Sequence, residues 1–201
     1  MDTENQTMIC TWYDSEKTIL HRKYSVSNRK KNGNFEEYRS DGTLDFSCNF
    51  VNDQVDGLFK KYDPDGTLTT DCIYKNNQSN GPFKTYFPNG SVQSYCICKN
   101  GQKHGPSKLY YPGGSLEMDC HFVNDQCHGP FKQYYPDGSL DIDCIYENGQ
   151  CNGPYKRYFP NGLLKIDCGF KNGQKYGNYR QYDPNGSLYI ECEYYYNYCD
   201  N

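Results

Sequence analysis

The sequence predicts an all-β protein in which an elongated, single antiparallel sheet is built from seven successive β-hairpin repeats. Three observations support this fold. Glycines recur at a constant interval of 24 residues, turn sequences divide each interval into two strand-length segments, and the second segment alternates apolar with polar residues. A fixed period of 20–50 residues is typical of repeat architectures, and alternation with period two is typical of strands.

Four columns of the repeat do not vary when each copy is counted from its first glycine, and the tenth position is the loop glycine Gly42, Gly66, Gly90, Gly114, Gly138, Gly162 and Gly186. The first position is Gly33, Gly57, Gly81, Gly105, Gly129, Gly153 and Gly177. The sixth is Tyr38, Tyr62, Tyr86, Tyr110, Tyr134, Tyr158 and Tyr182. The sixteenth is Cys48, Cys72, Cys96, Cys120, Cys144, Cys168 and Cys192. Seven copies without an insertion make the repeat the strongest signal in the chain.

The period also sets the expected domain boundaries. Residues 1–32 carry a degenerate half-copy, which we expect to form a partly mobile N-terminal cap, since terminal copies of repeat arrays are usually atypical. Residues 198–201 form a C-terminal tail. The repeats between them are 33–56, 57–80, 81–104, 105–128, 129–152, 153–176 and 177–197.

Two turn sequences punctuate each copy. The first, as in Pro136-Asp137-Gly138, predicts a three-residue hairpin loop that ends in a left-handed glycine. The second, as in Asn148-Gly149, leads into the next copy. About five and about eight residues lie between these turns, which are ordinary strand lengths.

The alternation predicts which residues share the buried face. In the fifth copy these are Leu140, Ile142, Cys144 and Tyr146. The three-residue loop places Tyr134 opposite Leu140, so we expect the tyrosine column to be a buried aromatic on that face. By parity Phe131 then points away. Either a bulge near the Gly-Pro pair returns Phe131 to the apolar face, or an aromatic row covers the other face.

Composition and charge exclude several classes of protein. The chain has 201 residues, a net charge of −4 and an apolar fraction of 35 %. Its 22 tyrosines argue against disorder, and its small acidic charge argues against a nucleic-acid partner. We expect no transmembrane segment, because no run approaches about 18 apolar residues. The first residues lack the pattern of a secretory signal, so we expect an intracellular, cytoplasmic protein.

The 12 cysteines are interpreted as packing residues. Equivalent strands of adjacent hairpins lie roughly 9–10 Å apart, whereas a disulfide needs Cα atoms within about 7 Å. The cysteine column therefore should not bridge to itself, and we expect small buried side chains. Cys127, His128 and Cys151 could in principle hold zinc, but their spacing matches no zinc motif, so we expect neither a metal nor another cofactor.

Two columns carry charge. The fourth position is basic in six copies, at Lys60, Lys84, Lys108, Lys132, Lys156 and Arg180. The fifteenth is acidic in five, at Asp71, Asp119, Asp143, Asp167 and Glu191. A pure lysine row would attract anionic lipid or acidic partners. Because the acidic row partly cancels its field, the simpler interpretation is a solvated surface that resists edge-to-edge pairing.

The motifs of common catalytic sites do not occur. The sequence contains no Gly-x-Ser-x-Gly elbow, Walker loop or His-Glu-x-x-His motif. An open repeat sheet distributes like groups in rows, whereas a catalytic site needs unlike groups at one place. We therefore expect no enzymatic activity and assign no catalytic residue.

The repeat resembles the MORN repeat, and more closely the MORN-variant repeat of YwqK-type antitoxin-like proteins. The residues that carry the resemblance are Gly153-Pro154-Tyr155-Lys156-Arg157-Tyr158, Asn161-Gly162-Leu163-Leu164 and Phe170-Lys171-Asn172-Gly173. The composition, without alanine and rich in Asn and Tyr, is similar to that of giant-virus MORN-repeat proteins. The resemblance implies an elongated sheet of hairpins with a role in scaffolding or protein binding, in the host cytoplasm or virion if the protein is viral.

The leading functional hypothesis is a non-enzymatic scaffold that binds an unidentified protein. Its candidate interaction surface consists of the six basic residues of the fourth position together with exposed aromatics, in particular Tyr198. The resemblance also implies an alternative, an antitoxin-like neutraliser of one effector protein. A third hypothesis, an adaptor to anionic membrane surfaces, is possible but not favoured.

The repeat makes a prediction about molecular dimensions. Seven hairpins contain about fourteen strands, which at roughly 4.8 Å each extend near 65 Å. Small-angle scattering of the full chain should therefore give an elongated particle. A radius of gyration typical of a globular protein of this length would contradict the expected sheet.

Overall fold

The computed structural model describes residues 6–195 and 198–200, and every regular element among them is a β-strand. The chain forms two compact units, residues 1–102 and residues 103–201. Each unit is an open antiparallel sheet of hairpins that follow one another along the chain. The predicted all-β class and hairpin repeat are thereby confirmed.

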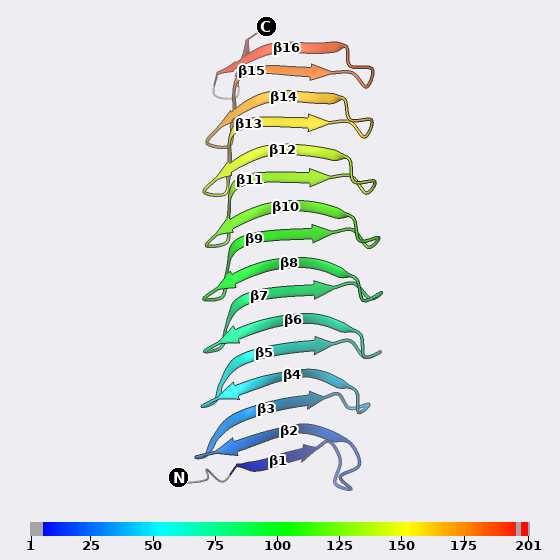
Figure 1. The fold of residues 1–201 in the computed structure, drawn as a ribbon, viewed down its shortest axis with the longest axis vertical. Helices are drawn as coiled ribbons and strands as arrows, with labels where there is room; N and C mark the ends of the chain where they lie inside the picture. The colour runs from blue at the N-terminus through cyan, green and yellow to red at the C-terminus, as the bar shows by residue number, and fades with distance from the viewer. Residues whose placement is uncertain (1–5, 196–197, 201) are drawn as a thin grey trace. The chain divides into compact units, whose positions relative to one another are not determined.

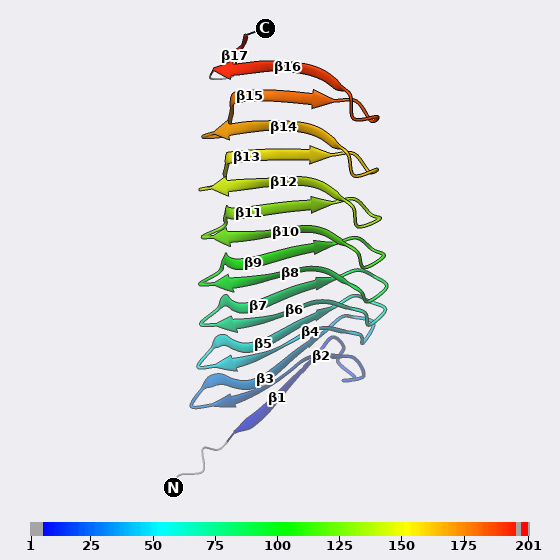
Figure 2. The ribbon, with the colours of Figure 1, turned by 45° about the horizontal axis from the view of Figure 1, so that its top comes forward.

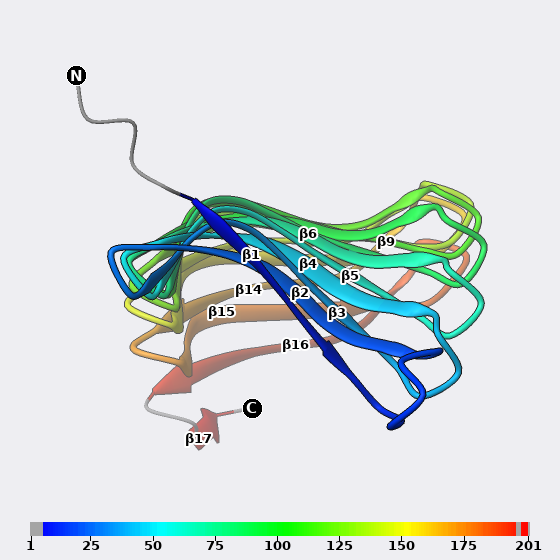
Figure 3. The same ribbon diagram turned by 90° about the horizontal axis from the view of Figure 1, so that it is seen from below.

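Unit 1 contains eight described strands, which pair in chain order (Figure 1). They are β1 (Thr7–Trp12), β2 (Leu20–Ser27), β3 (Lys30–Tyr38), β4 (Leu44–Val51), β5 (Gln54–Tyr62), β6 (Leu68–Lys75), β7 (Gln78–Tyr86) and β8 (Val92–Lys99). Seen along the strand stack, β1 to β6 rotate progressively (Figure 3), which is the usual sheet twist.

Unit 2 continues the same pattern with nine described strands, the last of them short (Figure 2). They are β9 (Gln102–Tyr110), β10 (Leu116–Val123), β11 (Gln126–Tyr134), β12 (Leu140–Glu147), β13 (Gln150–Tyr158), β14 (Leu164–Lys171), β15 (Gln174–Tyr182), β16 (Leu188–Tyr195) and β17 (Tyr198–Asp200). No helix in the described part of the chain is long and apolar enough to cross a membrane.

The loop inside each hairpin has the predicted geometry. The Tyr135 amide donates to the Ser139 carbonyl at 2.8 Å, and the Gly138 amide donates to the Tyr135 carbonyl at 2.9 Å. Gly138 has φ +86°, the left-handed conformation that glycine adopts without steric cost. The Tyr135 hydroxyl reaches the next hairpin and donates to the Tyr158 carbonyl at 2.8 Å. This hydrogen bond links the loop of one hairpin to the next hairpin, on the side of the sheet where the loops lie.

The turn between hairpins is a two-residue turn with positive φ at both positions, as in Asn148 (49°) and Gly149 (79°). This conformation matches the twist of the flanking strands. Each turn also bonds to the preceding one, since the Gly149 amide donates to the Cys127 carbonyl at 2.9 Å. Where Asp replaces the glycine, its side chain adds a bond, as when Asp125 accepts from the Lys103 amide at 2.7 Å.

The first strand of each of the seven repeats has nine residues rather than the expected five. Gly129 and Pro130 do not end the strand but lie within it, where the register against β10 shifts between Cys120 and Phe122. A bulge accommodates proline because no ladder hydrogen bond from its nitrogen is needed there.

The tyrosine column does not share a face with the cysteine column, contrary to the sequence prediction. Tyr134 pairs with Leu140 as expected, but a register shift follows at once, so that Phe131 pairs with Cys144. Because residues alternate along β11, Phe131 shares the face of Cys144 and Tyr134 lies on the other. In β3 the Tyr38 hydroxyl accordingly donates to Glu36 on that other face, at 2.8 Å.

A ladder of alternating aromatic and cysteine side chains forms the core of each sheet. We call this side the aromatic face. In unit 1 the directly opposed residues run Tyr24, Phe35, Cys48, Phe59, Cys72, Phe83 and Cys96. In unit 2 they run Ser107, Cys120, Phe131, Cys144, Tyr155, Cys168, Tyr179 and Cys192. All seven column cysteines are buried, which explains why this position is invariant.

Both ends of the described chain hold more structure than the sequence indicates. Residues 7–27 form a complete hairpin, β1–β2, where only half a copy is recognisable in the sequence. At the other end β17 begins at Tyr198 and pairs with β16. The side chain of Tyr198, a candidate interaction residue, lies outside the described part of the structure.

The placement of the two aromatic columns predicts different mutational costs within unit 2. Tyr179, 6 % exposed and packed with Cys168 and Cys192, belongs to the core. Tyr179→Ala should therefore cost about 3–5 kcal/mol, as for a large buried aromatic. Tyr134→Ala, at a half-buried position, should lower the free energy of unfolding by no more than about 1–2 kcal/mol. Denaturant unfolding of both variants checks this, and equal losses would contradict the assignment of the core.

Candidate functional site

The face opposite the aromatic core carries the charged columns, and we call it the charged face. The basic fourth position and the acidic fifteenth position face each other across every strand pair of unit 2. The resulting ladder runs Lys108, Asp119, Lys132, Asp143, Lys156, Asp167, Arg180 and Glu191. The predicted lysine row is therefore interleaved with carboxylates.

Several members of this ladder form ion pairs. The Nζ atoms of Lys108 and Lys132 lie 3.2 Å from carboxylate oxygens of Asp119 and Asp143, and Arg180 Nε lies 2.7 Å from Glu191. The hydrogen bond to Asp143 raises the pKa of Lys132. Exposed pairs of this kind add little stability, but they neutralise the field of the row.

The ladder is interrupted in unit 1. Here Lys60 faces Ser47 on one side and Asp71 on the other. Lys84 faces Asp71 and the uncharged Tyr95. Two lysines therefore share one carboxylate, which leaves a local excess of positive charge on the charged face.

An apolar row runs beside this positive segment, formed by the second and seventeenth positions of the repeat. Leu58 pairs directly with Ile73, and the two side chains are 58 % and 36 % exposed. Pro82 pairs with Ile97 one hairpin further on. In the copies before and after that of Leu58, the same repeat position is Asn34 and Pro82. Sequence reasoning missed this row, although the repeat register places its members in two columns.

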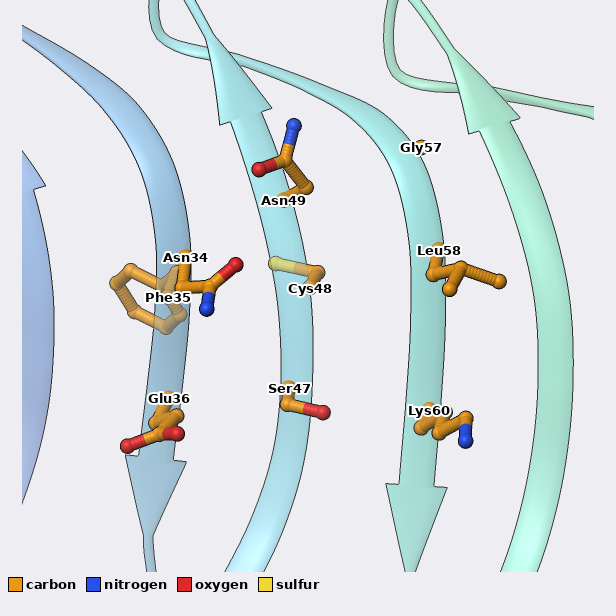
Figure 4. Close-up of a pocket in the computed structure, with 9 residues that line it drawn as sticks. All are labelled: Asn34, Phe35, Glu36, Ser47, Cys48, Asn49, Gly57, Leu58 and Lys60. Atoms are coloured by element: carbon orange, nitrogen blue, oxygen red, sulfur yellow. The ribbon is translucent and has the colours of Figure 1, made fainter.

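A trough follows the apolar row along unit 1. Its widest part is a cavity of about 470 Å³, whose lining includes Glu36, Ser47 and Lys60, in a line across three strands, with Leu58 beside them (Figure 4). A cavity of about 390 Å³ adjoins it at Glu36, and one of about 110 Å³ adjoins it at Leu58. The short side chain of Ser47, where most other copies have Asp or Glu, contributes to the hollow.

Burial makes the free thiols of the cysteine column poor nucleophiles at neutral pH. Burial raises the pKa of the Cys72 thiol to about 12, and a thiol that stays protonated at neutral pH is a poor nucleophile and metal ligand. Cys127 hydrogen-bonds to Cys120 and Cys151 to Cys144. Within residues 6–195, no three His, Cys, Asp or Glu side chains are arranged to hold a metal ion.

One member of the column departs from the expectation of thiols that only pack. Cys192 is disulfide-bonded, whereas Cys48, Cys72, Cys120, Cys144 and Cys168 carry free thiols. A disulfide at position sixteen was not anticipated from the sequence.

Comparison with known proteins identifies the repeat. A family model described as MORN repeat variant matches residues 55–76, 79–100, 103–124, 128–148 and 175–195, together more than half of the chain. The matched segments begin near the two-residue turns, so the family unit is the hairpin that follows each turn. No curated protein matches the chain. Repeats of this kind are non-enzymatic and generally act as scaffolds for protein or membrane interaction.

The charge ladder predicts a position-dependent cost of charge reversal. Lys132→Glu would place a carboxylate between Asp119 and Asp143, and like charges directly opposite are destabilising. We expect a loss of about 1 kcal/mol that shrinks with added salt. Lys60→Glu should lower the free energy of unfolding by less, because residue 60 faces only one acidic side chain. Denaturant unfolding at two ionic strengths measures both, and a larger loss for Lys60→Glu would contradict the ladder.

Proposed function

This chain belongs to the MORN repeat variant family, and we propose that it is a non-enzymatic scaffold that binds an extended protein segment in the trough of unit 1. The observation that supports this function is the exposed Leu58–Ile73 pair, which lies in the trough beside the interrupted charge ladder. The same proposal places the protein inside the cell, where most of its thiols stay reduced.

The chemistry of the trough indicates the kind of partner. Leu58 and Ile73 offer an apolar contact, and the side chains next to them are Lys60 and Lys84, which share Asp71. A peptide segment with apolar side chains and Asp or Glu would bury its apolar side chains against Leu58 and Ile73. Its carboxylates would neutralise Lys60 and Lys84. Electrostatic complementarity of this kind sets specificity and association rate more than affinity.

A membrane surface fits the same face less well. Anionic head groups favour a continuous basic patch, whereas unit 2 alternates lysine with aspartate along the whole charged face. Within the ladder of unit 1, the excess charge comes from Lys60 and Lys84, which share Asp71. The alternation therefore favours a protein segment over a lipid surface.

Peptide display on the full-length protein tests the proposal. Random twelve-residue peptides selected on the wild type should be enriched in Asp or Glu next to apolar residues. The double variant Lys60→Glu, Lys84→Glu should select basic peptides instead. Lys156→Glu, in the neutralised ladder of unit 2, is the matched control and should leave the selection unchanged.

A second pair of variants tests the apolar contact. Leu58→Asp should weaken binding of a selected peptide by at least about tenfold, which corresponds to roughly 1.4 kcal/mol. Leu163→Asp, at an exposed apolar residue in a loop, should have no effect. Selection without any acidic preference, or equal binding by both variants, would refute the trough as the site. Binding of phosphatidylserine vesicles that Lys60→Glu abolishes would favour the membrane alternative.

A further inference from the structure

Position twenty-three of the repeat lies next to the cysteine column on the aromatic face. In the fourth copy Cys127 pairs directly with Phe122, which is two residues after Cys120 on β10. In the fifth copy Cys151 pairs with Tyr146 in the same way, two residues after Cys144. Positions sixteen and twenty-three are therefore diagonal neighbours across the two-residue turn.

The two thiols of each of these pairs are in contact. The two thiols of each pair interact, and burial together with this interaction raises the pKa of Cys120 and of Cys144. In both pairs the position-sixteen thiol is buried and the position-twenty-three thiol is half-buried. Two sulfurs in contact across a hairpin need only a small movement to bond.

The last copy provides a second, independent observation. Cys192 stands at position sixteen, as Cys120 and Cys144 do, and it is disulfide-bonded. The same copy has a cysteine at position twenty-three, Cys199, whose side chain lies outside the described part of the structure. The backbone pairing of Cys199 with Tyr194 repeats the pairing of Cys127 and Cys151 with their aromatic partners.

We propose that positions sixteen and twenty-three form a disulfide site in the fourth and fifth copies, and that Cys120–Cys127 and Cys144–Cys151 oxidise to the disulfide state that Cys192 already has. Each bond would join the two strands on either side of a turn. Both pairs and Cys192 lie in unit 2, so this oxidation would cross-link unit 2. The inference does not depend on the partner proposed for unit 1.

The oxidation is a balanced thiol–disulfide exchange with glutathione disulfide. The thiolate of the more accessible Cys127 attacks one glutathione sulfur, forms a mixed disulfide and releases one glutathione. The thiolate of Cys120 then attacks the Cys127 sulfur and releases the second glutathione. Two electrons and two protons leave the protein with the two glutathione thiols. Burial raises the pKa of both thiols, so the exchange should accelerate as the pH rises.

The arrangement of basic residues allows a direct test by mass spectrometry. Trypsin releases each pair in its own peptide, residues 109–132 and 133–156. The native full-length chain is incubated with excess glutathione disulfide, alkylated with iodoacetamide and digested. Each peptide should lose two hydrogen atoms and carry no alkyl group. The peptide of residues 166–171 is the internal control, because position twenty-three of this copy is Lys175 rather than a second cysteine, so Cys168 should stay alkylated.

Two variants sharpen the test. Cys127→Ser should abolish the internal bond in residues 109–132 and leave the bond in residues 133–156 intact, which also shows that the sheet still folds. Ser79→Cys adds a position-twenty-three thiol beside Cys72 and should create a further bond, joining the peptides of residues 62–75 and 76–84. Native pairs that remain fully alkylated, or that carry only bound glutathione, would overturn the proposal.

Discussion

The structure depends on the direct opposition of an aromatic ring and a cysteine at nearly every strand pair. A single sheet has no second layer against which to bury its core, so the side chains of one face must fill the space above the backbone themselves. Cysteine is small and apolar, so each ring can lie partly over its neighbours. Cys72 is only 2 % exposed, although the described elements form no second layer over it.

This packing also explains the aromatic contacts between copies. Within the first copy the Phe35 ring centre lies 5.3 Å from that of Phe50 and 5.7 Å from that of Phe46, and across the boundary to the second copy Phe46 lies 5.6 Å from Phe59. Contacts of this kind run from one hairpin to the next, so a hairpin on its own would lack half of its neighbours. Stability in such an array comes from the interfaces between copies. The lysine and aspartate columns on the opposite face follow the same pairings but contribute mainly solubility.

The fold was largely predictable from the sequence, and the assignment of faces was not. The 24-residue period, the Pro-Asp-Gly loops and the Asn-Gly turns determine the hairpins, and their left-handed residues lie where the turn chemistry requires. Parity arguments failed for Phe131 and Tyr134 because the register shifts between Gln133 and Tyr134. A bulge inserts one residue into the pairing and reverses every assignment beyond it. The trough of unit 1 was missed for a related reason, since Leu58 and Ile73 are neighbours only in the observed register.

Position twenty-three shows how a constant backbone supports different local chemistry. Its side chain projects over the aromatic rings of the core, and the copies fill this place with unlike groups. Lys103 lies 5.1 Å from the Phe122 ring centre, and Lys175 lies 4.9 Å from that of Tyr194, both as cation–π contacts. In the fourth and fifth copies a thiol occupies the same place and contacts the column cysteine instead. A lysine at position twenty-three contacts the rings at any redox potential. A cysteine there lies beside the column cysteine instead, and in our proposal oxidation bonds the two. The distribution of these two residue types along the chain therefore determines which hairpins can be cross-linked, without any change to the fold.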